Sequence, residues 1–251
     1  MTDRSAGVGS LLKAGLSSMG AARASCLAAL VVAIALTVST NFLPPEPRPL
    51  AALAAVVIAQ GALFRHAFGR ASGFKGLRWG RDEWRLLGAN LLVLGLFLLI
   101  GSILLIVIGA IALGVARVSA PQLDVSSAEA WREALANAGP AGLFAGAAPI
   151  AALAILIWLG LRLSFTAPAT VAESGVRVLS AFPLTKGKVP PLLVPGILGL
   201  PMIACLIHGV APPRGVVFTA VSATITYLLL APAWSGALAH LYRQSAVTQD
   251  A

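Results

Sequence analysis

The chain has 251 residues, of which 58% are hydrophobic and 11% are charged, and its formal net charge is +9. An ordinary soluble domain carries about 25% charged residues, so this composition excludes a soluble globular domain and indicates a bilayer as the solvent. The two cysteines, Cys26 and Cys205, both lie in apolar runs, and their spacing indicates neither a disulfide framework nor a metal site.

Six apolar segments follow one another along the chain. A helix of about 20 residues crosses the hydrocarbon core of a bilayer, so we expect an all-α fold, a polytopic membrane helix bundle with about six transmembrane helices. The segments comprise residues 24–42, 49–64, 86–118, 141–165, 191–210 and 216–241. Together they form a predicted membrane domain, 24–241, which lies between an N-terminal segment, 1–23, and a short tail, 242–251.

The N-terminal segment carries apolar residues at roughly helical spacing, namely Val8, Leu11, Leu12, Leu16 and Met19. This pattern is compatible with a short helix in the membrane interface, and a frayed polar tail is the alternative. The first apolar segment follows positive residues, as in a signal peptide. Its apolar run is longer than the usual run of about 7–15 residues, so we expect it to remain as a membrane helix.

The third segment, 86–118, is unusually long. At about 1.5 Å per residue it would extend close to 50 Å, well beyond the roughly 30 Å of the hydrocarbon core. It therefore has to tilt, to project from the membrane, or to bend at a glycine such as Gly95, Gly101 or Gly109.

Residues 119–140 predict a short helix between the third and fourth segments. Ser126 or Ser127 is in position to cap its N-terminus, and Glu129 lies early in the helix. Gly139 is in position to stop the helix. We expect this helix to lie on the outer surface of the membrane.

The net charge of the chain lies on one side of the predicted topology. With a cytoplasmic N-terminus and six crossings, the inner segments hold 14 of the 18 Lys and Arg residues and five of the nine acids, and therefore all of the net charge of +9. This asymmetry follows the positive-inside rule and predicts that both termini are cytoplasmic. Because membrane insertion accounts for the charge, no nucleic-acid partner is expected. Arg outnumbers Lys by 14 to 4, which indicates a GC-rich bacterial genome and hence the inner membrane of a bacterium.

The inner loop 65–85 combines cations and aromatic rings with several glycines, which argue against one continuous helix. Such cations and rings suit the headgroup region of an anionic inner leaflet, so the loop predicts contact with membrane lipids. The plainer alternative is that inner loops are generally basic. The candidate membrane-surface and lipid-contact residues are Arg65, Arg70, Lys75, Arg78, Trp79, Arg81, Trp84 and Arg85.

The sequence holds no catalytic, cofactor-binding or metal-binding constellation. The run GKV that begins at Gly187 lacks both the preceding glycine and the following Ser or Thr of a phosphate-binding loop. The three histidines, His66, His208 and His240, are divided between the two faces of the predicted topology and cannot form one metal site. No apolar segment has an Asp, Glu, Lys or Arg near its centre, which argues against an ion-coupled pump.

Glu173 is the acid with the most basic neighbours in the inner loop, since Arg162, Arg177 and Lys186 lie in the same stretch. An ion pair that folds this loop onto the membrane is the main interpretation. A catalytic acid is the alternative.

The stretch 161–188, LRLSFTAPATVAESGVRVLSAFPLTKGK, resembles a recurring element of bacterial membrane proteins. These are the membrane domain attached to some glycerophosphodiester phosphodiesterases and the related YciC-like uncharacterised proteins. Pro183 departs from their pattern and argues against a continuous helix here. In the fused enzymes the chemistry belongs to a separate soluble barrel, so the resemblance carries no activity over. The positions of this loop motif, with the neighbouring Arg177 and Lys186, are Arg162, Pro168, Glu173, Ser180, Leu184, Thr185 and Gly187.

Three classes of function are compatible with these features. The predicted one is a non-enzymatic accessory or interaction module, without cofactor or metal, whose basic cytoplasmic face contacts anionic lipid or an unidentified protein partner. The second is a transporter, channel or lipid-handling protein that uses the helix-breaking Pro195, Pro201 and Pro232 of the fifth and sixth segments. The third is a membrane enzyme with Glu173 as its acid.

Overall fold

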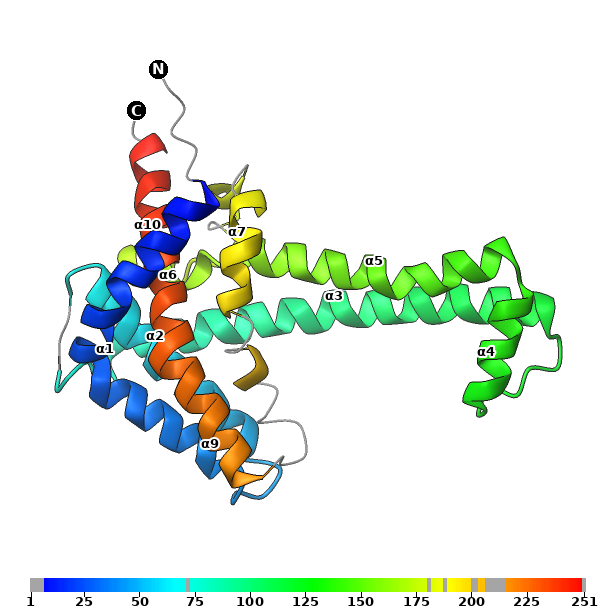
Figure 1. The fold of residues 1–251 in the computed structure, drawn as a ribbon, viewed down its shortest axis with the longest axis horizontal. Helices are drawn as coiled ribbons and strands as arrows, with labels where there is room; N and C mark the ends of the chain where they lie inside the picture. Colours follow the sequence, from blue (N-terminus) through cyan, green and yellow to red (C-terminus); the bar gives the residue numbers. More distant parts are fainter. Residues whose placement is uncertain are drawn as a thin grey trace. The chain divides into compact units, whose positions relative to one another are not determined.

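The computed structural model describes residues 7–70, 73–179, 182–186, 189–199, 203–205 and 215–249. Within these residues the secondary structure is helical, apart from one isolated β-bridge between Phe74 and Leu77 (Figure 1). The all-α prediction is therefore confirmed for the part of the chain that the structure describes. The helices are α1 (Val8–Ser39), α2 (Arg48–Ala67), α3 (Arg81–Ser119), α4 (Ala128–Asn137), α5 (Pro140–Leu163), α6 (Thr166–Ala172), η1 (Pro183–Thr185), α7 (Val189–Gly196), η2 (Ile197–Gly199), α9 (Val216–Ile225), η3 (Thr226–Leu230) and α10 (Ala231–Gln249).

Five helical stretches are long and apolar enough to cross a membrane. They coincide with five of the six apolar segments that the sequence indicates, and they support the prediction of a membrane protein. The five stretches are Val8–Ser39, Arg48–Ala67, Arg81–Ser119, Pro140–Ala172 and Val216–Ser245.

The fifth expected segment, 191–210, is described only in part. Its first half contains α7, a helix of 8 residues, and the short turn η2. Residues 200–202 and 206–214, including Pro201 and His208, lie outside the described residues. The described portion is too short to cross a bilayer, so a sixth crossing stays a prediction.

The chain divides into two compact units. Unit 1 comprises Met1–Leu92 and Leu161–Ala251, and unit 2 comprises Val93–Gly160. One core cluster of unit 1 is built mainly from small residues, which lets α1, α2 and α9 pack closely. Buried members of this core include Ala29, Ala33, Ala55, Ala59 and Ala223.

Helix α1 runs antiparallel to α9 and α10, so the start of α1 and the end of α10 lie at the same end of unit 1 (Figure 1). Gly15 permits their close approach, because a Cβ at this position would lie 2.5 Å from the carbonyl oxygen of Ala233. Leu11 is fully buried in a second core cluster that also contains Leu238 and Leu241. Residues 8–23 of the N-terminal segment, for which the sequence leaves a short interfacial helix or a frayed tail open, therefore form the first half of α1, which packs against α10.

The stretch α9–η3–α10 contains a wide π-turn at Thr226–Leu230, directly before Pro232. A proline has no N–H to donate, and its ring clashes with the carbonyl four residues earlier in an α-helix. The wider turn relieves this conflict without ending the helix. The helix breaker that the sequence indicates in this segment is thus accommodated as a bulge.

Unit 2 contains α4, the short helix that the sequence predicts between the third and fourth segments. The Ser127 hydroxyl caps it and accepts a hydrogen bond from the Ala130 N–H at 3.2 Å. Ser126 instead donates to Asp124, and this hydrogen bond holds the pKa of the Asp124 carboxyl below its usual value. Gly139 has φ +56°, the left-handed conformation of a helix stop. Both end signals are confirmed, with Ser127 as the cap.

Candidate functional site

The polar features of unit 1 gather where α2 ends, α3 begins and α10 ends. The term basic end denotes residues 65–85, 162–179, 182–186 and 238–245, of which 71 and 72 lie outside the described residues. This region contains the described members of both candidate sets from the sequence. Ser180 and Gly187, which belong to the loop motif, lie outside the described residues.

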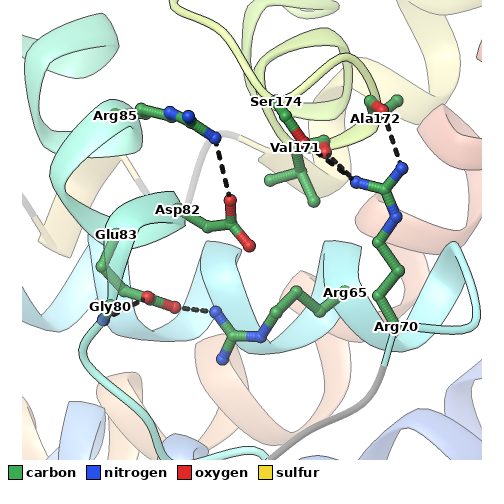
Figure 2. A network of polar contacts seen from close by, with 9 residues as sticks. All are labelled: Arg65, Arg70, Gly80, Asp82, Glu83, Arg85, Val171, Ala172 and Ser174. Carbon is green, nitrogen blue, oxygen red and sulfur yellow. Dashed lines mark hydrogen bonds and ion pairs between the residues drawn. The ribbon is translucent and has the colours of Figure 1, made fainter.

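An ion pair between Arg65 and Glu83 lies inside the basic end (Figure 2). Only 3% of the Arg65 side chain and 1% of the Glu83 side chain are exposed. Arg65 Nη2 also donates to the carbonyl oxygen of Gly76 at 3.0 Å, and the Gly80 N–H donates to Glu83 Oε2 at 2.8 Å. These bonds tie the second half of the connecting loop to one buried pair of charges.

The prediction that Arg65 contacts lipid is wrong, because its side chain is buried in the protein. Local sequence suggests exposure, since Arg65 belongs to a run of basic residues. Its carboxylate partner lies on the next helix, and only the fold brings the two together. A buried guanidinium without such a partner would be strongly destabilising.

The loop between α2 and α3 is shaped by residues in the left-handed conformation. Gly69, Gly73 and Gly76 have φ values of +70°, +85° and +79°, and Lys75 has φ 45°. A Cβ on Gly76 would lie 3.0 Å from Cys26 Cα, so the loop packs directly on α1 at this point. The prediction that the glycines prevent one continuous helix across 65–85 is confirmed.

Large aromatic side chains project from this loop and from the first turn of α3. Phe74 is 74% exposed, Trp79 is 43% exposed and Trp84 is 62% exposed. The two tryptophan rings meet edge to face with centroids 5.5 Å apart. Lys75 Nζ lies 5.9 Å from the centroid of the Phe74 ring. Exposed rings with adjacent cations form the arrangement that a membrane interface favours.

Arg70 joins this loop to the end of α6 (Figure 2). Its Nη1 donates to the Val171 carbonyl at 3.0 Å and its Nη2 donates to the Ala172 carbonyl at 3.1 Å. Nη1 also lies 3.3 Å from the Ser174 hydroxyl oxygen. Arg70 therefore satisfies carbonyls at the end of a helix and holds the two loops of the basic end together.

Thr185 links two parts of the loop motif by hydrogen bonds. Its buried hydroxyl lies 2.8 Å from the Phe182 carbonyl and 3.2 Å from the Arg162 carbonyl. The Arg162 guanidinium lies 4.1 Å from the centroid of the Phe182 ring. Pro183 begins the short turn η1, so a continuous helix is absent from 182–186, as the sequence indicates.

Glu173 forms an ion pair with Arg177, with Oε2 and Nε 3.0 Å apart. The Tyr242 hydroxyl donates to Glu173 Oε1 at 2.7 Å. The Tyr242 ring also meets the rings of Phe68 and Phe165 edge to face, each with centroids 5.9 Å apart. The predicted ion pair is confirmed with Arg177, whereas the link to α10 is a tertiary contact that no local pattern indicates.

A cavity of about 290 Å³ opens between α1, α2 and α10. It brings His66 and His240 to one site, together with Arg243. The described residues contain no group of three or more His, Cys, Asp or Glu that could hold a metal ion. The further lining residues are Ala14, Ser17, Ser18, Ala22, Leu63, Ala67, Pro232, Ser235, Gly236 and Ala239.

Comparison of the chain with protein-family models, with curated proteins and with solved structures gives no match. The resemblance of 161–188 to the phosphodiesterase-associated membrane domain and the YciC-like proteins stays a prediction from the sequence. The candidate function therefore rests on the geometry and the charges of the basic end.

Proposed function

We propose that the protein is a multispan inner-membrane protein of a bacterium that serves as a non-enzymatic accessory or interaction module. Its basic end lies in the cytoplasm and contacts the anionic inner leaflet or a protein partner. The observation that carries this proposal is the group of exposed cations and rings around Trp79 and Trp84, on a loop that the buried Arg65–Glu83 pair holds from inside.

The physical basis is pre-organisation. Each Lys or Arg close to an anionic leaflet contributes about 1 kcal/mol of attraction, and tryptophan favours the headgroup region. Lys75 and Arg81 are exposed, and Arg85 is partly exposed beside Asp82 at 3.6 Å. Because the loop is already fixed in shape, little conformational entropy is lost when these side chains meet the lipid surface.

Two observations support the proposed orientation. The inner segments of a six-crossing topology carry the whole net charge of +9. The start of α1 and the end of α10 also lie at the same end of unit 1, which agrees with an even number of crossings (Figure 1). Fusion of a fluorescent protein and of alkaline phosphatase to the C-terminus tests this orientation. We expect fluorescence without phosphatase activity, and an active phosphatase would refute it.

The lipid contact can be measured from the lipids that surround the protein in native membranes. The protein is extracted in polymer-bounded bilayer discs, and the ratio of anionic to zwitterionic lipid is determined by mass spectrometry. We expect enrichment of anionic lipid that decreases about twofold or more in the triple variant Lys75→Gln, Arg81→Gln, Arg85→Gln, because three attractions of about 1 kcal/mol each are removed.

The matched control removes the same number of charges from the opposite side of the predicted topology, with Arg48→Gln, Arg117→Gln and Arg132→Gln. Its lipid ratio should equal that of the wild type. An equal decrease in both triple variants would show that enrichment follows total charge, and the proposal that the basic end makes the contact would be abandoned.

A transporter, channel or lipid-handling protein is the second candidate, and the π-turn before Pro232 is the observation that favours it. The packed alanines of unit 1 favour the accessory module instead. Thiol labelling of Ala33→Cys and Ala59→Cys separates the two. We expect both thiols to remain unlabelled by a water-soluble maleimide, because these positions are fully buried. Rapid labelling would favour a water-filled path.

A further inference from the structure

We propose that the cavity between α1, α2 and α10 is a specific site for the phosphate group of an anionic headgroup. This inference rests on the proposed function, since it assigns one particular anion site that borders the basic end. The observation is the convergence of one arginine and two histidines from two helices on a cavity of about 290 Å³. Pockets for small molecules start at roughly 300 Å³, so a small headgroup suits this volume better than a nucleotide.

Arg243 supplies the permanent positive charge. One of its N–H groups donates to the Ala67 carbonyl at the end of α2, and its guanidinium lies 5.6 Å from the centroid of the Phe68 ring. A guanidinium carries five N–H donors, so donors remain for a phosphate after the bond to Ala67. These contacts at the end of α2 fix the position of the planar guanidinium, and a fixed guanidinium favours paired hydrogen bonds to phosphate oxygens.

The two histidines add ring N–H donors from two different helices. His66 comes from the last turn of α2, and His240 lies about one turn before Arg243 on α10. His240 Nε2 lies 3.0 Å from the amide nitrogen of Gln244, which orients the ring. Neutral imidazole donates one N–H and its protonated form donates two, so both rings can bond to phosphate oxygens.

The remaining lining residues favour an anion over a cation. None of the lining residues that the structure describes is an Asp or Glu. Mg²⁺ and Ca²⁺ need carboxylate or carbonyl oxygens, and Zn²⁺ takes at least three protein ligands, so this wall with its two histidines suits none of them. The hydroxyls of Ser17, Ser18 and Ser235 donate to carbonyls of their own helices at 3.1, 2.9 and 3.1 Å, so Arg243 and the histidines supply the donors of this site.

The test uses the purified full chain in an uncharged maltoside detergent and isothermal titration calorimetry. The probes are dihexanoyl phosphatidic acid, dihexanoyl phosphatidylcholine and inorganic phosphate. We expect phosphatidic acid to bind, and phosphatidylcholine to bind at least about tenfold more weakly. Arg243→Gln should weaken the binding of phosphatidic acid about tenfold or more, because it removes a charge-assisted hydrogen bond.

Two further variants separate the cavity from general surface charge. Arg132→Gln removes the same charge from the exposed surface of α4 and should leave the affinity within about twofold, since Arg132 does not line the cavity. Ser17→Phe keeps every charge but fills the cavity, and it should abolish binding. Because Ser17 is exposed, Ser17→Phe should fold normally, and it tests the cavity even if Arg243→Gln fails to fold.

The titration with inorganic phosphate distinguishes a site for free phosphate from a site for a lipid headgroup. Equal affinity for inorganic phosphate and phosphatidic acid would assign the site to free phosphate, and tighter binding of phosphatidic acid would assign it to a lipid headgroup. The inference is overturned if phosphatidic acid does not bind, if Arg132→Gln and Arg243→Gln lose affinity equally, or if Ser17→Phe binds normally. The proposed function survives such a failure if lipid enrichment in native membranes still depends on Lys75, Arg81 and Arg85.

Discussion

Arg65 in the last turn of α2 and Glu83 in the first turn of α3 form an ion pair whose two side chains are 3% and 1% exposed. Two hydrogen bonds attach the loop between the two helices to this pair. The Gly76 carbonyl accepts one from Arg65, and the Gly80 N–H donates one to Glu83. The pair thus holds in place the loop that carries Phe74 and precedes Trp84, the two most exposed rings of the basic end.

Loss of one partner of this pair should be strongly destabilising. Glu83→Ala leaves a buried guanidinium without its carboxylate, and we expect unfolding to become easier by about 3–5 kcal/mol. The double variant Arg65→Met, Glu83→Leu should recover most of that loss, because it removes both buried charges. Denaturant unfolding in detergent, followed by tryptophan fluorescence, measures these differences.

The control is Asp82→Ala, whose partly exposed pair with Arg85 should contribute about 1 kcal/mol or less. Equal effects of Glu83→Ala and Asp82→Ala would contradict the role of the buried pair.

Two glycines of the same loop should differ in their tolerance of a side chain. Gly69 and Gly76 have φ values of +70° and +79°, so alanine at either costs about 1–2 kcal/mol of backbone strain. Only Gly76 meets a neighbour, because its Cβ would lie 3.0 Å from Cys26 Cα, whereas nothing lies within 4 Å of a Cβ on Gly69. Gly76→Ala should therefore be less stable than Gly69→Ala by a further 1–3 kcal/mol or so. Thermal unfolding in detergent checks this ranking, and the reverse order would refute the contact with α1.

The hydroxyl of Tyr242 should stabilise the loop that carries Glu173. Tyr242→Phe removes a 2.7 Å hydrogen bond to a carboxylate and keeps the ring contacts, so we expect a loss of about 1–2 kcal/mol. Arg177→Gln removes an ion pair whose side chains are 48% and 40% exposed, and it should cost less than about 1 kcal/mol. The two variants are compared by chemical unfolding. A larger loss for Arg177→Gln would show that the ion pair, and not the tyrosine, holds this loop to α10.

Ser127 and Ser126 should differ in their effect on α4. Ser127→Ala removes the N-cap, which typically contributes about 1 kcal/mol, so the amides in the first turn of α4 should exchange with solvent roughly fivefold faster. Ser126→Ala removes only the exposed bond to Asp124 and should leave that exchange unchanged. Hydrogen exchange followed by mass spectrometry measures the exchange rate of these amides in both variants. Faster exchange in Ser126→Ala alone would move the cap to the other serine.

Local patterns predicted the helices of this chain well. Hydropathy marked six segments, and five of them coincide with described helices that are long enough to cross a membrane, because burial in lipid requires continuous apolar residues over about 20 positions. The ends of α4 and the break between α2 and α3 were also predictable. Caps and left-handed glycines depend on a few neighbouring residues, so these features can be read from the sequence of Ser127, Gly139 and Gly76 alone.

Contacts between distant residues could not be predicted in the same way. Arg65 belongs to a basic run that indicates an exposed surface, yet Glu83 makes it part of the interior. The bond from Tyr242 to Glu173 and the meeting of His66 with His240 likewise join separate helices. Neither hydropathy nor spacing encodes which helix faces which.

The sequence by itself determined the helical class and the membrane-length segments, because both depend on composition or on residues close together in the chain. Only the tertiary structure decided which cation of the basic end is buried, which acid holds it, and that two histidines and Arg243 line one cavity. These outcomes depend on how α1, α2, α3 and α10 pack, and that packing sets the distances between charged groups and the solvent that each retains.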